Sequence, residues 1–223
     1  MEETLKAVVE DRAYQTHGTS DDPIYRMVDR AVRSFHPGGG TLVDVGCGRG
    51  RLWEYLHDYF SSYIGADVVS YEGFPRNGDF RVIDVESGRV PLDDQSADVV
   101  VAAETIEHVE NPRAFMRELK RLVRPGGLVV ASTPNQLSLL SKMTLLLNNQ
   151  FNAFREAPGL YPAHITALVE IDLIRIARET GLTDVVIRHS DSGRIPKLPL
   201  KWPRFLKGRA FSDNVLIAAR RAK

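Results

Sequence analysis

The chain has few of the features that mark secreted and membrane proteins. Its 223 residues include a single cysteine, Cys47, which excludes an internal disulfide and fits a reducing compartment. The N-terminus carries Glu2, Glu3 and Lys6 where a secretion signal would have an apolar segment. The most apolar stretch, residues 137–147, contains polar side chains and is much shorter than the ~20 residues of a membrane-spanning helix. We therefore expect a soluble, cytoplasmic protein.

Net charge is absent as well, because 29 basic side chains balance 29 acidic ones. The balance hides an asymmetry: residues 194–223 hold nine lysines and arginines and one acid, which leaves +8 there and −8 on residues 1–193. Such a region can face phosphates or an anionic membrane, or can be an ordinary solvated surface. The chain length and a hydrophobic content of 43% are sufficient for one domain with a full core.

The most informative stretch that is present is T-L-V-D-V-G-C-G-R-G at residues 41–50. An apolar run that contains Asp44 leads into three glycines at alternate positions, Gly46, Gly48 and Gly50. Glycines allow a sharp turn with positive φ and a close approach of a ligand to the main chain. The helix predicted after the loop would direct its first N–H groups at that ligand. This arrangement is typical of a loop that binds a nucleoside.

The glycine spacing separates two kinds of nucleoside site. A dinucleotide-binding loop, G-x-G-x-x-G, needs a third glycine at position 51, where this chain has Arg51, so a nicotinamide dehydrogenase is disfavoured. The pattern D-x-G-x-G-x-G resembles the first motif of class I S-adenosylmethionine (SAM) dependent methyltransferases. Cys47 lies inside this motif, where we expect its small side chain to pack rather than to do redox chemistry.

Strand-like and helix-like segments alternate along the rest of the chain. This alternation predicts an α/β fold, namely a Rossmann-like, doubly wound, seven-stranded and mostly parallel sheet with helices on both faces. Apolar runs and turn signals predict strands over residues 41–45, 63–67, 80–85, 98–102, 128–132, 183–188 and 214–219. Helices are predicted over 24–35, 51–60, from Asn111 to about 123, and over 165–180.

Residues 133–163 carry no clear strand and interrupt the alternation. We expect one domain over residues 1–223, with a helical lid inserted after the fifth strand. Its parts are an N-terminal helical cap (1–38), a SAM-binding core (39–133), an acceptor-site lid (134–163) and a last part with a helix, two strands and a basic insert (164–223).

Acidic residues follow the second and third predicted strands. Ligands of doubly wound sheets lie beyond the carboxyl ends of the strands, where Asp67 can accept hydrogen bonds from both ribose hydroxyls. Asp84 can accept the adenine amine while the Val85 N–H meets a ring nitrogen, although each acid alone could be a turn residue. The cofactor contacts predicted in this way are Asp44, Gly46, Cys47, Gly48, Gly50, Asp67, Val68, Asp84, Val85, Ala103 and Glu104.

The second half of the core strengthens the resemblance. E-T-I-E-H-V at 104–109, Asn111-Pro112, an amphipathic helix and R-P-G-G-L at 124–128 match the later motifs of a class I methyltransferase domain. The chain is most similar to the ubiquinone-biosynthesis type of O-methyltransferase. The resemblance implies SAM as cofactor, S-adenosylhomocysteine (SAH) as product, and as acceptor a hydroxyl of a small or lipid-like metabolite.

Glu104, Glu107 and His108 would share one face of a helical turn, and could hold Mg²⁺, Mn²⁺ or Zn²⁺. The cluster resembles metal sites of ubiquinone-type and small-RNA 2′-O-methyltransferases; the latter add a second histidine, for which His164 is the candidate. Alternatively, Glu104 contacts the cofactor while the other two order the loop or line the acceptor pocket. We favour the arrangement without a metal, in which His108 is the general base and Glu107 a second catalytic residue.

The sequence indicates less clearly which residues contact the acceptor. Tyr14 and His17 belong to an N-terminal segment that closes over the pocket in such domains, and His164 precedes a helix near the pocket mouth. We expect these three to contact the acceptor, although a structural role is an equal alternative for His164.

The lid is rich in leucine and phenylalanine, which favours an apolar or lipid-like acceptor. It also suits a contact with a membrane surface, aided by Trp202, Phe205 and the basic tail, so that the protein would be peripheral to the membrane. The alternative is an amphipathic helix that packs on its own domain or on a second copy in a homodimer.

Two other functions remain compatible with the motifs. An RNA methyltransferase could use the basic C-terminal region on phosphates, although we consider nucleic acid the less favoured partner; its binding would weaken steeply with salt. A domain that keeps SAM or SAH as a structural or sensing ligand would transfer no methyl group.

Overall fold

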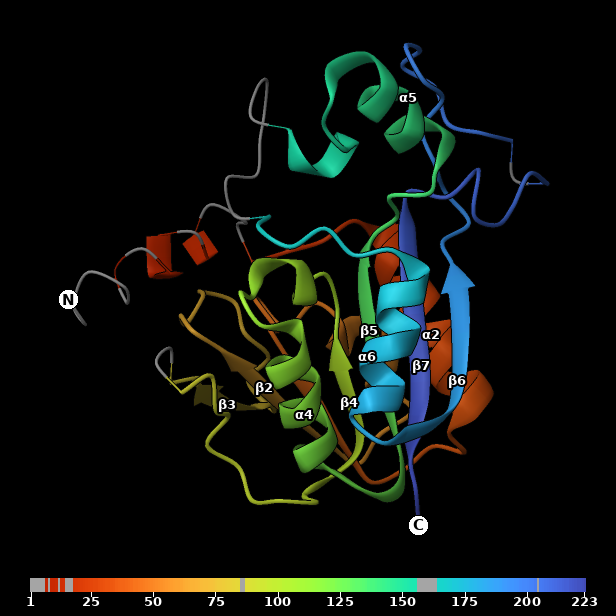
Figure 1. Ribbon diagram of the computed structural model, residues 1–223. Helices are drawn as coiled ribbons and strands as arrows, with labels where there is room; N and C mark the ends of the chain where they lie inside the picture. The colour runs from red at the N-terminus through yellow and green to blue at the C-terminus, as the bar shows by residue number, and fades with distance from the viewer. Residues whose placement is uncertain are drawn as a thin grey trace.

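The computed structural model describes residues 7, 9–11, 13–14, 18–84, 87–155, 164–203 and 205–223. A seven-stranded sheet in the order β3-β2-β1-β4-β5-β7-β6 forms its centre (Figure 1). Strands β1 to β5 pair in parallel, and β7 runs antiparallel between β5 and β6. The strands are β1 (Thr41–Val45), β2 (Ser62–Asp67), β3 (Asp79–Val82), β4 (Ala97–Ala102), β5 (Val123–Pro134), β6 (Leu182–His189) and β7 (Asn214–Arg221). The predicted Rossmann-like, mostly parallel sheet is confirmed.

Helices cover both faces of this sheet, as predicted. On one face α4 (Pro112–Leu122) and α6 (Glu170–Glu179) contribute to one apolar cluster, and on the other α2 (Asp22–Phe35) and α3 (Trp53–Leu56) contribute to a second (Figure 1). The Asn111 side chain caps α4 by accepting a hydrogen bond from the Ala114 N–H at 3.0 Å. No helix in the described part of the chain is both long and apolar enough to cross a membrane.

Several elements differ in length from their predictions; β3, predicted over 80–85, ends at Val82. The helix predicted over 51–60 is the short α3, because the turns before it close through i→i+3 hydrogen bonds such as Trp53 N–H to Gly50 O at 3.0 Å. Strand β5 is longer than 128–132 because Val123 already pairs with Ala97 of β4 and residues 133–134 still pair with β7. Helix α6 begins at Glu170 rather than near 165, because the N–H groups of Ile165 and Thr166 bind the Glu107 carbonyl instead.

The insertion after β5 is helical, as predicted, through the residues that the structure describes. It contains α5 (Leu139–Asn148) and the single turn η2 (Asn152–Phe154), both above the carboxyl edge of the parallel strands (Figure 1). The alternative in which this helix packs on its own domain is wrong for its second half, because Leu146 is 85% exposed and Leu147 is 60% exposed. The lid therefore leaves an apolar outer surface.

Candidate active site

A cavity of about 890 Å³ opens at the carboxyl edge of the parallel strands. This volume is in the upper part of the ~300–1,000 Å³ range of small-molecule pockets. The loops after β1, β2 and β4 line it, together with residues 18–21 of the N-terminal segment and the inner side of the insertion. Nine of the predicted cofactor contacts line this cavity: Asp44, Gly46, Cys47, Gly48, Asp67, Val68, Asp84, Ala103 and Glu104.

The glycine loop turns sharply, and other parts of the protein lie so close to it that a side chain would not fit. Gly46 has φ +75°, and a Cβ on it would lie 2.3 Å from the Thr105 hydroxyl oxygen. A Cβ on Gly48 would lie 2.2 Å from the carbonyl oxygen of Gly18. These two glycines are thus required by close contacts within the chain.

Two other loop residues are placed by packing. Gly50 does not line the cavity, which corrects its prediction as a cofactor contact; its N–H closes the turn onto the Cys47 carbonyl at 2.8 Å. The Cys47 side chain is buried, and burial raises the pKa of its thiol well above the ordinary value. A thiol held neutral in this way fits the predicted packing role.

Asp67 is fixed at the end of β2 by main-chain donors on both sides. Its Oδ2 accepts the Gly48 N–H and its Oδ1 accepts the Val68 N–H, each at 2.7 Å. Burial raises the pKa of Asp67, while these N–H groups act in the opposite direction. A carboxylate has about four acceptor positions, so free lone pairs remain for a ligand in the cavity.

Asp44 lies beneath the loop with 2% of its surface exposed. Its Oδ2 accepts a hydrogen bond from the Tyr63 hydroxyl at 3.0 Å. Burial raises the pKa of Asp44 to about 7, and the nearby Asp67 adds to this effect while the Tyr63 hydrogen bond opposes it. Near neutral pH, this carboxyl therefore gains or loses a proton readily.

The buried Asp44 predicts how stability depends on pH in the ligand-free protein. Because its pKa rises from 3.8 in the unfolded chain to about 7, its contribution to stability is complete below pH 4 and is lost as the pH rises through 7. We expect Asp44→Asn to reduce the fall in Tm between pH 5 and pH 8, measured by thermal melts. Part of the dependence of Tm on pH will remain in this variant, because burial also raises the pKa of Glu104 to about 7. The exposed Asp93→Asn is the control, and an unchanged slope in Asp44→Asn would contradict the assignment.

Glu104 follows β4 with a left-handed backbone, φ +53°. Its carboxylate accepts hydrogen bonds from the Ser132 hydroxyl and from the Asn214 side-chain amide, both at 2.8 Å. Burial raises the pKa of Glu104 to about 7, against the effect of these two hydrogen bonds. The carboxylate is therefore held at the ends of β5 and β7.

This position corrects the predicted acid cluster. The short helix η1 (Ile106–His108) begins two residues after Glu104, so Glu104 does not share a helical face with Glu107 and His108. Sequence reasoning also missed Ser132 and Asn214 as its partners. The sequence did place Asn214 at the start of a predicted strand. Its side chain reaches the site because β7 runs antiparallel to β5, so that the start of β7 lies beside the end of β5.

Glu107 is fully buried, and it does not line the cavity. Neither of its carboxylate oxygens has a hydrogen-bond partner among the described residues. Burial first, and then the Glu104 carboxylate, raise its pKa well above the ordinary value. Glu107 was predicted to be a second catalytic residue, and from this position it would act on the reaction only through neighbouring side chains.

Two histidines lie between Glu107 and the cavity. His108 and His164 both line it, and their ring centres are 4.8 Å apart. His164 Nδ1 lies 2.8 Å from the Ala153 carbonyl, so it carries the proton and leaves Nε2 facing Glu107 Oε1 at 3.9 Å. Burial and the nearby His108 lower the pKa of His164 to about 4, which keeps this ring neutral at pH 7.

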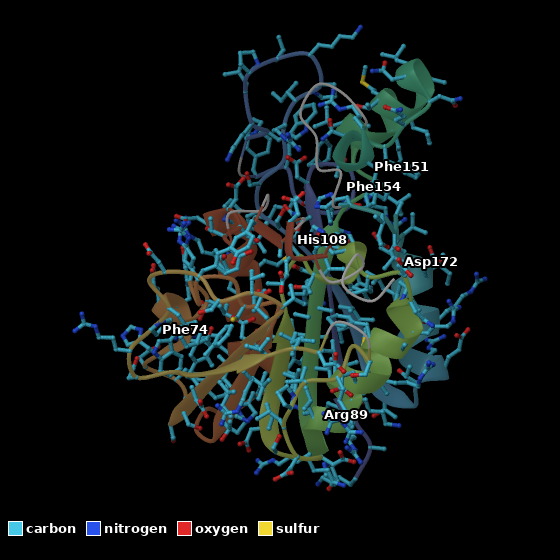
Figure 2. All side chains as sticks on the ribbon, turned by 90° about the vertical axis from the view of Figure 1, so that its left-hand side faces the viewer. Phe74, Arg89, His108, Phe151, Phe154 and Asp172 are labelled. Carbon is cyan, nitrogen blue, oxygen red and sulfur yellow. The ribbon has the colours of Figure 1, made fainter. Side chains whose placement is uncertain are left out.

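The main chain explains why residues 56 positions apart meet here. The Glu107 carbonyl accepts the Ile165 and Thr166 N–H groups, both at 3.0 Å, which holds the segment after His164 against η1. Above the two rings, Phe154 of η2 lies 5.4 Å from the His164 ring, and Figure 2 shows His108 beneath Phe151 and Phe154. The insertion therefore packs an apolar side chain, Phe154, on His164.

The set that could hold a metal differs from the predicted one. Glu107, His108 and His164 each offer a ligand atom, and these atoms lie within 4.8 Å of one another. One carboxylate with two imidazoles suits Zn²⁺ or a similar divalent ion. Glu104 is not part of this set, because Ser132 and Asn214 hold it elsewhere.

The remaining predicted contacts are only partly within the described residues. Asp84 lines the cavity, while Val85 and His17 lie outside the part of the chain that the structure describes. Tyr14 does not line the cavity; it is 55% exposed and packs edge-to-face on Tyr71, which does. Tyr14 is therefore a support for the cavity wall in this structure rather than an acceptor contact.

Comparison with known proteins identifies the chemistry that this cavity serves. A family model described as a methyltransferase domain matches residues 18–187, most of the chain. The chain belongs to this methyltransferase family. SAM is its cofactor, and the described residues fit it, because Asp67 and the turn at Gly46–Gly48 face a cavity large enough for a nucleoside and a second ligand.

Individual proteins with similar sequences are also named as methyltransferases. The methyltransferase domain is 29% identical over 158 residues to a probable SAM-dependent methyltransferase of Mycolicibacterium smegmatis, with 69% of this chain and 62% of the relative covered. It is 34% identical over 110 residues to a ubiquinone biosynthesis O-methyltransferase of Cereibacter sphaeroides, and this match covers 44% of this chain and 42% of the relative. The chain thus spans about two fifths to three fifths of the lengths of these relatives.

A solved structure shows the same fold. It is a SAM-dependent methyltransferase of Thermotoga maritima, described as a possible histamine N-methyltransferase, with a TM-score of 0.63 at 19% identity. The match covers 89% of this chain and 91% of that one. The class I methyltransferase fold therefore extends over nearly the whole methyltransferase domain.

Proposed function

We propose that this SAM-dependent methyltransferase domain transfers a methyl group to a hydroxyl of a small or lipid-like metabolite. The observation that carries the proposal is the position of His108, which lines the same cavity as the cofactor loop and Asp67. An imidazole there is suited to take a proton from an acceptor hydroxyl. The similarity to ubiquinone biosynthesis O-methyltransferases supports oxygen as the methylated atom.

The residues of the chain would have the following roles in the reaction. Bound SAM supplies a methyl group on a positively charged sulfur, and transfer to the acceptor oxygen releases neutral SAH. Asp67 and the glycine loop hold the cofactor at the carboxyl ends of β1 and β2. His108 accepts the hydroxyl proton, and the insertion, whose Phe154 packs on His164, would keep water from the reacting groups.

Glu107 would act as a positioning residue in this scheme. Its buried carboxyl lies within 4.8 Å of ligand atoms of both histidines and has no competing hydrogen bond among the described residues. This carboxyl, which burial keeps neutral, would help to orient the two imidazole rings for proton transfer in a site that excludes water. Neutral His164 fills the space between the two groups without adding a like charge.

Calorimetric titration of SAM into the purified protein, before and after EDTA treatment, tests the proposal. We expect micromolar binding that EDTA does not change, because the cofactor contacts involve no metal ligand. Acceptor screening then follows, with SAH release as the readout. Turnover that requires a divalent ion after EDTA would instead place a metal at Glu107, His108 and His164. Failure to bind either SAM or SAH would contradict the proposal.

A further inference from the structure

Exposed apolar side chains are concentrated on one part of the molecule. Of the 11 large hydrophobic side chains that are exposed in the described part of the chain, seven belong to α5 or to the loop before β7. Leu146 is 85% exposed and Phe205 is 81% exposed, which are the two highest values. The seven are Met143, Leu145, Leu146, Leu147, Leu198, Leu200 and Phe205. An apolar group of this kind marks a surface that contacts another apolar phase or molecule.

The two segments lie side by side at the end of the molecule that carries the cavity (Figures 1 and 2). Hydrogen bonds join them: the Leu139 N–H binds the Ala210 carbonyl at 2.9 Å, and the Asn135 amide donates to the Arg209 carbonyl at 2.7 Å. Within the loop, an antiparallel bridge between Arg194 and Lys201 closes a small hairpin. Helix α5 and the loop before β7 are therefore held together as one surface.

The charged side chains of this surface are mostly basic. Residues 134–155 and 192–212 together contain eight lysines and arginines and no aspartate or glutamate. Some of these cations are neutralised, since Arg194 pairs with Asp213 and Arg209 pairs with Glu170. Lys142 on α5 and Lys197 in the hairpin are exposed and form no ion pair with any residue that the structure describes.

The same segments also form the outer part of the cavity. Ser141 on the inner side of α5 lines it, while Leu146 and Leu147 of the same helix are exposed. Arg194 and Lys201, the bridged pair of the hairpin, line it from the other side. A molecule that leaves an apolar phase in contact with this surface would therefore reach the active-site cavity between α5 and the hairpin.

We propose that the surface made by α5 with residues 194–203 and 205–207 docks on an anionic lipid bilayer and lets the cavity take its acceptor from the lipid phase. Leucines enter the headgroup boundary while Lys142 and Lys197 face anionic headgroups, the combination that holds peripheral proteins on membranes. The delivery of a lipid-like acceptor rests on the proposed function. The docking itself needs neither SAM nor acceptor, so the failure of one is distinguishable from the failure of the other.

Vesicle flotation of the whole chain tests the docking. One set of vesicles contains phosphatidylcholine alone, and the other contains equal parts of phosphatidylcholine and phosphatidylglycerol. We expect the protein to float with the mixed vesicles and to remain in solution with the first set. SAM affinity, measured separately by calorimetry, should be the same in the wild type and in the variants described below. None of the residues that these variants replace lines the cavity.

Two pairs of variants separate the apolar and the charged contributions. Leu146→Ser with Leu147→Ser should weaken binding at least about tenfold, as expected for the loss of one buried leucine. Lys142→Gln with Lys197→Gln should weaken it about 25-fold, from about 1 kcal/mol for each charge near an anionic surface. The matched controls are the exposed Ile171→Ser on α6 and Lys223→Gln at the C-terminus, which Figure 1 shows at the opposite end from α5. Both controls should bind as the wild type does.

Several results would overturn the proposal. These are no binding to mixed vesicles, equal binding to phosphatidylcholine alone, or equal losses in the control variants. A dimer in sedimentation that the leucine variants dissociate, without vesicle binding, would assign the surface to a second copy. Binding of single-stranded RNA that the lysine variants reduce and the leucine variants do not, again without vesicle binding, would assign it to nucleic acid.

Discussion

Asp67→Ala is expected to weaken SAM binding by about 100-fold or more. Each hydrogen bond from a ligand hydroxyl to a charged acceptor contributes ~1.5–3 kcal/mol, and the ribose offers two hydroxyls to this carboxylate. The alanine variant would also release the Gly48 and Val68 N–H groups that Asp67 accepts, so the glycine loop would lose its support. Calorimetric titration with SAM measures the loss directly.

Two variants serve as controls for this experiment. Asp67→Asn keeps the side-chain volume and one acceptor oxygen, so its affinity should lie between those of the wild type and the alanine variant. Asp93→Ala removes an exposed carboxylate away from the cavity and should bind SAM normally. Thermal melts show that each variant is folded. Wild-type affinity in a folded Asp67→Ala would remove Asp67 from the cofactor site.

His108→Ala is expected to lower turnover by ~10²–10⁴-fold, the usual contribution of a general base, while SAM affinity changes by no more than a few-fold. His108 lines the cavity next to His164, whereas the main contacts at the cofactor loop are made by Asp67 and Asp44. SAH release with an acceptor that the wild-type enzyme methylates measures turnover, and calorimetry measures SAM binding.

The exposed His57→Ala, which is outside the cavity lining, should behave as the wild type does in both assays. A positioning role for His108 would leave the dependence of turnover on pH unchanged in its glutamine variant, whereas removal of a general base changes it. A loss of SAM affinity as large as the loss of turnover would contradict the assignment of a base.

The motifs of the core were readable from the sequence because each depends on local chemistry. The glycine spacing at 46, 48 and 50 predicts a turn that only residues without a Cβ accept, and the structure contains that turn. Asp67 was predicted to be a cofactor residue from its place at the end of a strand, and both of its oxygens are held at that place by the main chain. Alternating apolar segments likewise predicted the sheet and its helices on both faces.

The acid and histidine cluster was not predictable in the same way. Sequence spacing treated Glu104, Glu107 and His108 as one helical face, but the left-handed backbone at Glu104 places its carboxylate against Ser132 and Asn214. His164 enters the site because main-chain hydrogen bonds hold residues 165 and 166 to the Glu107 carbonyl. Hydrogen bonds between distant segments have no signature in local periodicity.

By itself, the sequence determined the fold class, the cofactor loop and the place of Asp67, because backbone freedom at glycine and the burial of apolar runs act over a few residues. Only the tertiary structure decided that Glu107 is buried away from the cavity, that His108 and His164 line it, and that α5 exposes its leucines beside a basic hairpin. These properties depend on which distant segments pack together. The antiparallel β7 and the hydrogen bonds at Glu107 set that packing, and with it the protonation and exposure of each group.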